Sequence, residues 1–360
     1  MKFGIWTPLP HTVRHDDALT AAIAEATRVG PVDGPDKALE IAAETLQTGE
    51  ALGFVTTLIA ARHSGPDLDA WLLASALATR TSAIELIVAV HPGIFNPQMV
   101  AKLAASLDRI SGGRAAINVV NGWWQAEFDN FGNGSWLPSS GDRYERMSEF
   151  MQVLRGLWQA DGPFTFNGRF YRTRDALLPL KPIRAYPPIY AASSNSAGQD
   201  MIAQYGDIWF TLPHDTQAYL DFDPLIAGLR DDVAGVKARA AGYGRKLAAG
   251  VTAHVIACET DGEAHEKARE LAEYGKRESI NQVVASATGS GLVGSYRTVA
   301  QRLDAYAEAG FELALLHFYP MIDGMRDFMA NVVPLMKSRA PAAPERVHAR
   351  VAAGVIAEPR

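Results

Sequence analysis

Hydroxyl groups that could bind an anion follow one of the apolar segments of this chain. Ser193 and Ser194 come directly after the apolar run 189–192, and a helical pattern begins near Ala197. Backbone N–H groups at the start of a helix, together with hydroxyl donors, bind anions without a cationic side chain. The same serines could simply cap the helix, since serine is a good N-cap residue. The residues alone leave both interpretations open.

Side chains that could move a proton follow other apolar segments. Four histidines lie near the ends of predicted strands: His63, His91, His254 and His317. Imidazole can donate or remove a proton near pH 7, and a tyrosine such as Tyr319 can stabilise a developing oxyanion. A single histidine in such a position is usually structural, whereas four favour a shared site. Their spacing matches no zinc motif, so we predict no metal.

An amide interrupts the most informative segment, which runs from Asp108 to Trp124. Gly112-Gly113 predicts a tight turn between a helix and the apolar strand 115–120, because glycine adopts positive φ at little cost. Asn118 lies inside that strand, and Asn121 and Trp124 follow it. These amides could satisfy neighbouring backbone, and Trp6 and Trp124 could be core residues; alternatively they line a pocket.

Apolar strand patterns alternate with helical patterns along the chain, which indicates a parallel sheet covered by helices. We predict strands at Phe3–Thr7, Val55–Ala60, Ile84–Val90, Ala115–Val120, Ile189–Ala192, Ile208–Thr211, Thr252–Cys258 and Leu313–His317. We predict helices at Lys37–Leu52, Asp69–Thr79, Gln98–Ile110, Arg143–Gln159, Ala197–Tyr205, Gln217–Ala241, Glu263–Tyr274 and Thr298–Ala309. Eight such units match a (β/α)8 barrel. A doubly wound sheet stays open, although no Gly-x-Gly-x-x-Gly follows the first strand.

Three insertions interrupt the repeat: one after strand 1, one after strand 4 and one before the last helix–strand unit. His11–Pro35 contains a possible short helix over Ala18–Thr27, and Phe164–Thr173 predicts a hairpin around Asn167-Gly168. Gln282–Ser295 is rich in Gly and Ser and predicts a mobile loop near the site. We assign residues 1–336 to one barrel domain and 337–360 to a tail that either frays or packs on a neighbouring subunit.

Composition limits the classes of function. The chain has 360 residues, 48% of them hydrophobic, and a net charge of −6, which argues against a nucleic-acid binder. We find no segment that predicts a membrane span or a signal peptide, and the single Cys258 excludes an internal disulfide. We expect a soluble cytoplasmic protein, with Cys258 a small core residue at a strand end.

Four motifs, in this order and spacing, resemble the bacterial luciferase-like superfamily of flavin-dependent monooxygenases. They are Ile110-Ser-Gly-Gly-Arg114 with the strand after it, Asp142-Arg-Tyr-Glu-Arg146, Pro187-Pro-Ile-Tyr-Ala-Ala-Ser-Ser194 and Gly291-Leu-Val-Gly-Ser-Tyr296. The resemblance extends from Phe3 to Met336. It is greatest to the two-component branch that contains alkanesulfonate, dimethylsulfone and pyrimidine monooxygenases.

The resemblance implies a site for FMN, used as FMNH2 together with O2. It places the flavin phosphate at Ala192, Ser193 and Ser194, and it implies flavin contacts for Asn118, Tyr144, Arg143 and Trp6. It also implies that His254 and Tyr319 lie on the substrate side and Asn121 near the oxygen-reacting edge of the ring; His91 is a further catalytic candidate. The family more often has two glycines where this chain has Ala191-Ala192.

Two departures bear on the substrate. Alkanesulfonate relatives have an arginine at the position of Thr252, and a second arginine in the loop represented here by 285–291, which has no cation. A buried sulfonate needs charge-assisted donors, so their loss favours a neutral substrate such as a sulfone. His63, Arg62 or Arg297 could still supply a positive charge.

The resemblance therefore predicts a two-component monooxygenase that cleaves the C–S bond of a small sulfone or alkanesulfonate in sulfur metabolism. A separate NAD(P)H:FMN reductase would supply the reduced flavin, and the enzyme would form a homodimer or homotetramer. Three alternatives stay open: oxygenation of a heterocycle or amide, a deazaflavin-dependent reaction, and a non-catalytic flavin-binding barrel.

Overall fold

A closed barrel of eight parallel strands forms the centre of the molecule. The computed structural model describes residues 1–10, 34–215, 218–277 and 288–338. Within them the strands pair in the cyclic order β1-β12-β9-β8-β7-β4-β3-β2. Their bounds are β1 Lys2–Trp6, β2 Thr56–Ile59, β3 Glu85–Val90, β4 Ala115–Val119, β7 Ile189–Ala192, β8 Ile208–Thr211, β9 Ala248–His254 and β12 Leu313–His317.

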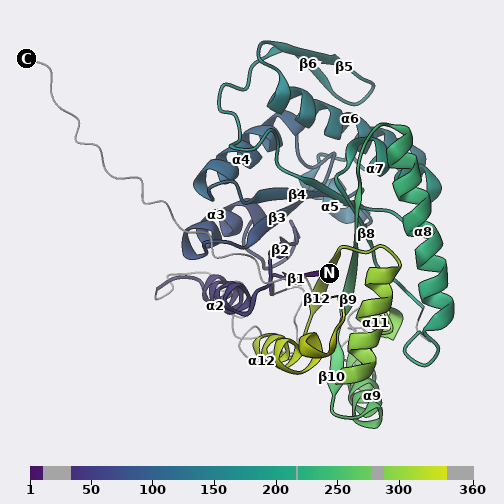
Figure 1. The fold of residues 1–360 in the computed structure, drawn as a ribbon. Coiled ribbons are helices and arrows are strands. Elements are labelled where there is room, and N and C mark those ends of the chain that lie inside the picture. Colours follow the sequence, from purple (N-terminus) through teal and green to yellow (C-terminus); the bar gives the residue numbers. More distant parts are fainter. Residues whose placement is uncertain (11–33, 216–217, 278–287, 339–360) are drawn as a thin grey trace, which may run out of the picture.

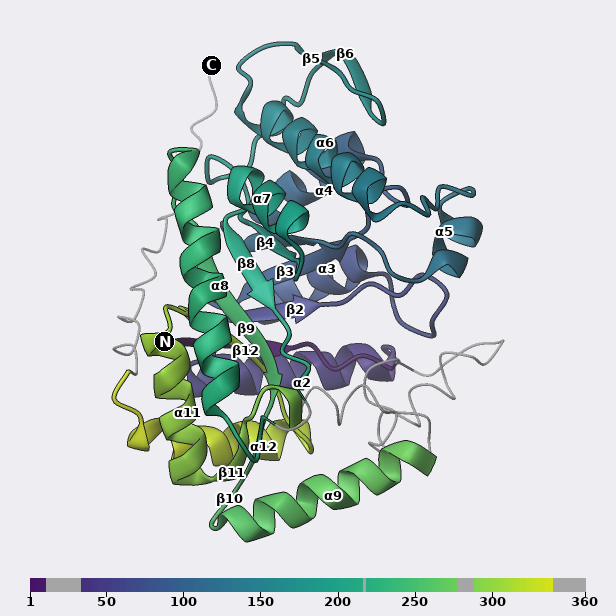
Figure 2. The same cartoon turned by 90° about the vertical axis from the view of Figure 1, so that its right-hand side faces the viewer.

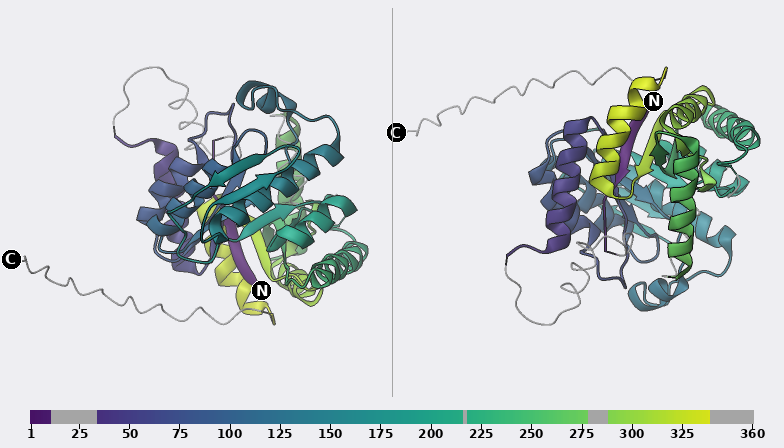
Figure 3. Two further views of the ribbon diagram at one scale, coloured as in Figure 1. Left: turned by 90° about the horizontal axis from the view of Figure 1, so that it is seen from above. Right: turned by 90° about the horizontal axis from the view of Figure 1, so that it is seen from below.

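Helices surround the strands, as Figures 1 and 3 show, and confirm the predicted (β/α)8 barrel. They are α2 Lys37–Leu52, α3 Ala70–Arg80, α4 Pro97–Ile110, α6 Ser140–Gln159, α7 Ser196–Tyr205, α8 Asp223–Gly242, α11 Tyr296–Glu308 and α12 Met321–Asp327. Most begin at an Asp, Asn or Ser whose side chain accepts a backbone N–H of the first turn. Such caps satisfy donors that the helix itself leaves unpaired.

The turn before β4 has the predicted geometry and a buried cation beside it. Gly112 and Gly113 have φ of 69° and 89°. Arg114 is buried and donates to the carbonyl oxygens of Ser111, Ala78, Thr81 and Ile84 and to the hydroxyl of Thr81, at 2.8–3.0 Å. One guanidinium therefore joins the end of α3 to the starts of β3 and β4, at the end of the barrel opposite the strand exits.

Strand register fills the barrel interior with one apolar cluster. Its buried members are Leu58, Ile87, Ala116, Tyr190, Phe210, Leu313 and Leu315. Paired residues of adjacent strands point to the same side, and successive residues alternate between the two sides. Tyr190 donates to Glu85 Oε1 at 2.6 Å near the strand starts. Polar side chains reappear at the opposite end of the interior, where the strands exit.

The insertion after β4 forms the predicted hairpin, with a longer turn than the Asn-Gly dipeptide indicated. β5 Phe164–Asn167 and β6 Arg172–Ala176 are antiparallel, and Gly168–Tyr171 connect them. The buried carboxylate of Glu149 on α6 accepts the backbone N–H groups of Arg169, Phe170 and Tyr171 at 2.7–3.0 Å. This long-range anchor, which local sequence does not reveal, sets the turn. The hairpin and α9 Asp261–Arg277 lie at opposite ends of the molecule (Figures 1 and 2).

The boundaries predicted for the seventh strand were wrong. The barrel strand β9 starts at Ala248 and ends at His254, whereas β10 Ile256–Cys258 pairs in parallel with β11 Val293–Ser295 outside the barrel. The apolar run continues through this break, so periodicity could not locate it. The described part of the predicted mobile loop is also ordered, because Ser290, Leu292 and Val293 are fully buried. Cys258 ends β10 and is partly exposed rather than a core residue.

Two short helices did not stand out in the sequence. They are α5 Gln125–Phe131 after β4, and α12. The chain continues from α12 into a short π-helix at Phe328–Val332 and a 3-10 turn at Val333–Leu335. The proposed helix at Ala18–Thr27 lies outside the described residues. Near the C-terminus, Asp304 accepts the backbone N–H groups of Lys337 and Ser338. Residues from 339 onward also lie outside the described part of the chain. None of the described helices is long and apolar enough to cross a membrane.

We predict that Arg114→Met lowers the free energy of unfolding by about 3 kcal/mol or more, because several buried carbonyl oxygens lose a charged donor. Urea unfolding measures the change. Arg109→Met is the matched control: that arginine lies in the last turn of α4, shortly before Arg114, is exposed, and donates to Lys181 O. The prediction fails if the two variants lose the same stability.

Candidate active site at the strand exits

The register of the strands brings several predicted site residues to the interior at the exit end. Asn118 pairs with Tyr190 and Thr252 with Leu315, both members of the interior cluster, while His254 pairs with His317. Trp6 packs against the same cluster. In the cyclic strand order, β4 and β12 lie opposite each other. Asn118 therefore faces the histidine side of the barrel across its mouth.

Buried polar atoms at this mouth lack partners within the described part of the protein. They are Asn118 Oδ1, Asn121 Oδ1 and Thr252 Oγ1. A buried acceptor without a hydrogen bond costs roughly 1–3 kcal/mol, which a polar ligand can offset. Ala192, which pairs with the interior residue Phe210, is nevertheless exposed, so there is open space beside it. This combination fits a bound polar ring system better than a filled core.

A hydrogen-bonded cluster forms where β7 leads into α7. Tyr144 Oη lies 3.0 Å from Ser193 Oγ, and Asn195 Nδ2 donates to Tyr144 Oη at 2.9 Å. The N-cap of α7 is Asn195, whose Oδ1 accepts the Gly198 N–H at 2.8 Å. The capping interpretation of the serines was therefore wrong. Ser193 is buried against Tyr144, and Ser194 is exposed beside the start of the helix.

The sequence interpretation missed two members of this cluster, Asn195 and Gly198. A Cβ on Gly198 would lie 2.1 Å from Ser193 Oγ and 2.5 Å from Tyr144 Cε1, so only glycine permits this packing. Asn195 could have been recognised as an N-cap residue, but Ser193 and Ser194 before it are equally suitable caps by residue type. Residues 194–197 are exposed, which leaves the first turn of α7 open to a ligand.

Arg143 is engaged with its own loop. Its guanidinium lies 4.7 Å from the Trp136 ring and donates to the carbonyl oxygens of Leu137 and Pro138, at 2.6 and 3.0 Å. These contacts fix the segment before α6, and so place Tyr144 on the next position of the helix.

Aromatic rings line the β12 side of the mouth. His254 and His317 stack with centroids 4.5 Å apart, and Trp6 lies 5.8 Å from His317. Burial, and to a smaller extent the neighbouring His317, lower the pKa of His254 well below its usual value. His254 is therefore neutral near pH 7. Tyr319 lies two residues beyond His317 and is partly exposed.

The other two strand-end histidines form a pair over β2 and β3. His63 Nε2 lies 3.4 Å from His91 Nδ1. Burial lowers the pKa of His63, and it lowers the pKa of His91 to about 3, with smaller contributions from His63 and Arg62. Glu127 on α5 accepts the backbone N–H of His63 at 3.0 Å. The sequence interpretation missed this buried carboxylate, because α5 itself was not predicted.

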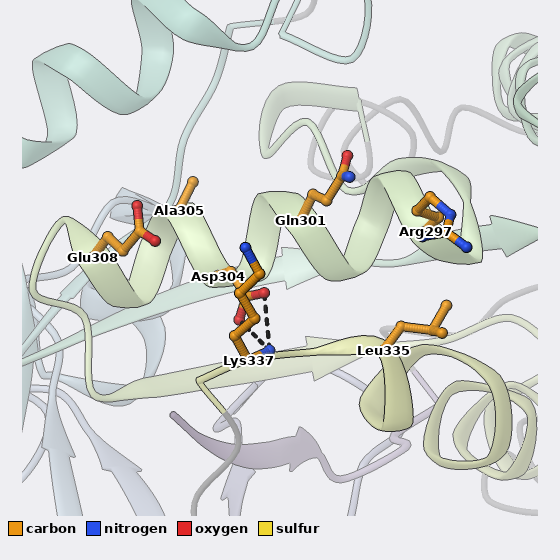
Figure 4. Close-up of a pocket in the computed structure, with 7 residues that line it drawn as sticks. All are labelled: Arg297, Gln301, Asp304, Ala305, Glu308, Leu335 and Lys337. Carbon is orange, nitrogen blue, oxygen red and sulfur yellow. Dashed lines mark hydrogen bonds between the residues drawn. The ribbon is translucent and has the colours of Figure 1, made fainter.

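Arg297 does not belong to the mouth. It lines a hollow of about 290 Å³ on the outer surface, between α11 and the chain after the 3-10 turn, as Figure 4 shows. The hollow contains none of the predicted catalytic or flavin-binding residues. Nor do any three His, Cys, Asp or Glu side chains come together as metal ligands among the described residues.

We predict that His91 makes stability depend on pH below 6.5. Its pKa falls from 6.5 in the unfolded chain to about 3 in the folded protein, so the unfolded state binds the proton first and stability falls with pH through this window. At pH 5 the loss is about 2 kcal/mol. Urea unfolding at pH 7.5 and pH 5 should show a smaller pH-dependent loss for His91→Asn than for the original protein. Equal losses would contradict this assignment.

Comparisons with known proteins agree with this arrangement. The family model described as luciferase-like monooxygenase matches residues 1–313. An FMNH2-dependent dimethylsulfone monooxygenase from Pseudomonas putida is 31% identical over 294 residues, which cover 74% of this chain and 77% of the relative.

Solved structures share the fold at lower identity. EDTA monooxygenase from Chelativorans sp. BNC1 superposes with a TM-score of 0.73 at 18% identity, over 95% of each chain. DmoA from Hyphomicrobium sulfonivorans superposes with a TM-score of 0.70 at 18% identity, over 95% of this chain and 90% of its own. The extent of the family match and the identity to the dimethylsulfone enzyme settle the family: the chain belongs to the luciferase-like monooxygenases.

Proposed function

We propose that the protein is an FMNH2-dependent monooxygenase that oxygenates a small, neutral organosulfur compound and cleaves its C–S bond. The observation that carries this proposal is the identity to the dimethylsulfone monooxygenase over about three quarters of both chains. Among the described residues, the interior of the barrel mouth presents uncharged groups, which supports the proposal independently. They include the amides of Asn118 and Asn121 and the hydroxyl of Thr252, beside a neutral His254.

The described residues fit FMN in two places. Tyr144, Ser193 and Ser194, with the open first turn of α7, would hold the phosphate, because hydroxyl and backbone N–H donors suit a dianion. Asn118 and Asn121 would meet the polar edge of the ring, and Ala192 and Trp6 would line it. When bound, reduced FMN supplies the two electrons that monooxygenation of the substrate by O2 requires.

The side chains around the substrate would orient it and exclude water. A methyl sulfone, O2 and FMNH2 would give an alkanesulfinate, formaldehyde, FMN, water and one proton. His254 is neutral and would offer its ring nitrogens to the substrate as hydrogen-bond partners, and Tyr319 can donate a hydrogen bond to a developing oxyanion. His91 is more deeply buried than His63 and lies beside it, so it would act on the substrate only indirectly, by positioning the His63 ring.

A separate NAD(P)H:FMN reductase would supply the reduced flavin. We further propose that residues 1–336 act as one barrel domain followed by a tail, and that the enzyme works in the cytoplasm as a homodimer or homotetramer. Gel filtration with light scattering tests the assembly.

We predict turnover of dimethylsulfone, with release of methanesulfinate and formaldehyde, in the presence of a flavin reductase, NADH and O2. Long-chain alkanesulfonates should react more slowly, because Thr252 offers the buried sulfonate no positive charge. Product analysis over a panel of sulfones and sulfonates decides this. Release of sulfite from alkanesulfonates, without activity on dimethylsulfone, would reverse the substrate assignment.

We also predict that Ser193→Ala combined with Tyr144→Phe weakens binding of reduced FMN by at least roughly tenfold, since a hydrogen bond to a charged group contributes about 1.5–3 kcal/mol. Anaerobic titration measures the affinity, which in the original protein should exceed that for FAD or NADH. Two variants serve as controls and should bind FMN normally: Ser106→Ala on the outer helix α4, and His254→Asn on the substrate side. If the double variant melts at a lower temperature but keeps its affinity, the cluster is purely structural.

A further inference from the structure

Arg62 lies on the rim of the barrel mouth in an arrangement that the proposed reaction does not yet explain. It follows β2, and its guanidinium carbon lies 4.0 Å from the centroid of the Trp124 ring and 5.0 Å from that of Trp123. These tryptophans follow β4, so the contact connects two of the loops at the strand exits. The side chain is only 20% exposed. Cation–π contacts of this kind hold a guanidinium in one orientation.

Glu127 fixes the loop that carries Arg62. Its carboxylate is buried and accepts the backbone N–H groups of His63 and Ser64, at 3.0 and 3.4 Å, and the Ser64 hydroxyl at 3.3 Å. Arg62 Nε lies 3.6 Å from the same Oε1 atom, an ion pair rather than a hydrogen bond. The carboxylate therefore uses its hydrogen-bonding capacity on the backbone and leaves the guanidinium incompletely paired.

The two terminal nitrogens of the Arg62 guanidinium are available to a ligand. Within the described part of the chain, neither Nη1 nor Nη2 of Arg62 donates a hydrogen bond to a protein acceptor. A planar fork held between an aromatic ring and a carboxylate, with its two terminal nitrogens unused, is suited to bidentate binding of an oxyanion. An arginine that served only to pack the tryptophans would not need this orientation.

The two other residues that the sequence offered as sources of positive charge, Arg297 and His63, do not provide such an edge. Arg297 lines the hollow on the outer surface (Figure 4). His63 lies against His91, Phe95 and Phe131, and burial lowers its pKa, so it carries little charge near pH 7. Of the three, Arg62 alone combines a permanent charge with a position on the rim.

We propose that Arg62, oriented by Trp124, Trp123 and Glu127, is the recognition site for the sulfinate group of the product as it leaves the barrel mouth. This inference rests on the proposed function. A neutral sulfone is compatible with the uncharged groups that the described residues place in the interior, whereas the sulfinate formed from it is an anion that these groups do not stabilise. The rim guanidinium supplies charge-assisted donors that those interior residues lack, and so draws the anion outward.

The test is binding of methanesulfinate to the full-length protein without flavin, measured by isothermal titration calorimetry. We expect Arg62→Gln to weaken binding at least tenfold and Arg62→Lys to weaken it less, because lysine keeps the charge but loses the fork. Arg80→Gln is the matched control, since Arg80 is an ion-paired arginine on α3. It should bind sulfinate like the original protein. Melting temperature and FMN affinity establish that each variant is folded.

Binding to the original protein that is lost in Arg62→Gln and kept in Arg80→Gln supports the site. Equal affinity in the original protein and Arg62→Gln, or no binding of methanesulfinate to the original protein, overturns it. If Arg62→Gln does not fold, the comparison of Arg62→Lys with Arg80→Gln decides instead, and equal affinities in those two overturn the site. Failure of the proposed function is seen separately, as absence of dimethylsulfone turnover, because this titration requires neither flavin nor catalysis.

Discussion

The register of eight parallel strands is the constraint on which the site depends. Because the sheet is closed, alternate residues of every strand face the interior. The last inward-facing residue of each strand therefore contributes its side chain to the barrel mouth. Apolar residues such as Ile87 and Leu315 fill the lower interior, whereas Asn118, Thr252 and His254 occupy the same face near the exits. A shift of one residue in any strand would move its polar group outside the barrel.

Buried charged side chains connect the loops to this barrel mainly by hydrogen bonds to backbone groups. Arg114 donates to several carbonyl groups, while Glu149, Glu127 and Asp304 each accept several N–H groups. A charged group in such a position satisfies backbone atoms that irregular segments leave unpaired. The hairpin, the loop of His63 and the chain after the 3-10 turn are held in this way, so the rim of the mouth is positioned by long-range contacts.

In the described part of the mouth, neutral groups line the interior and a charged group lies on the rim. Burial keeps the imidazoles of His254 and His91 uncharged near pH 7, and the interior amides and hydroxyl carry no charge. The fixed positive charge of Arg62 lies on the rim, balanced in part by Glu127. The neutral substrate and the anionic product that we propose would therefore meet different environments, the substrate in the interior and the product at the rim.

Local sequence determined the eight strands, most of the helix bounds, the Gly112-Gly113 turn and the position of two serines directly after β7. It could do so because hydrophobic periodicity and the conformation of glycine are properties of short segments. The tertiary structure decided the rest. It ended β9 at His254 within a continuous apolar run, gave the capping role to Asn195, and brought Glu127 of the unpredicted helix α5 to Arg62. Each of these depends on atoms brought together from distant parts of the chain, and no pattern within one segment contains that information.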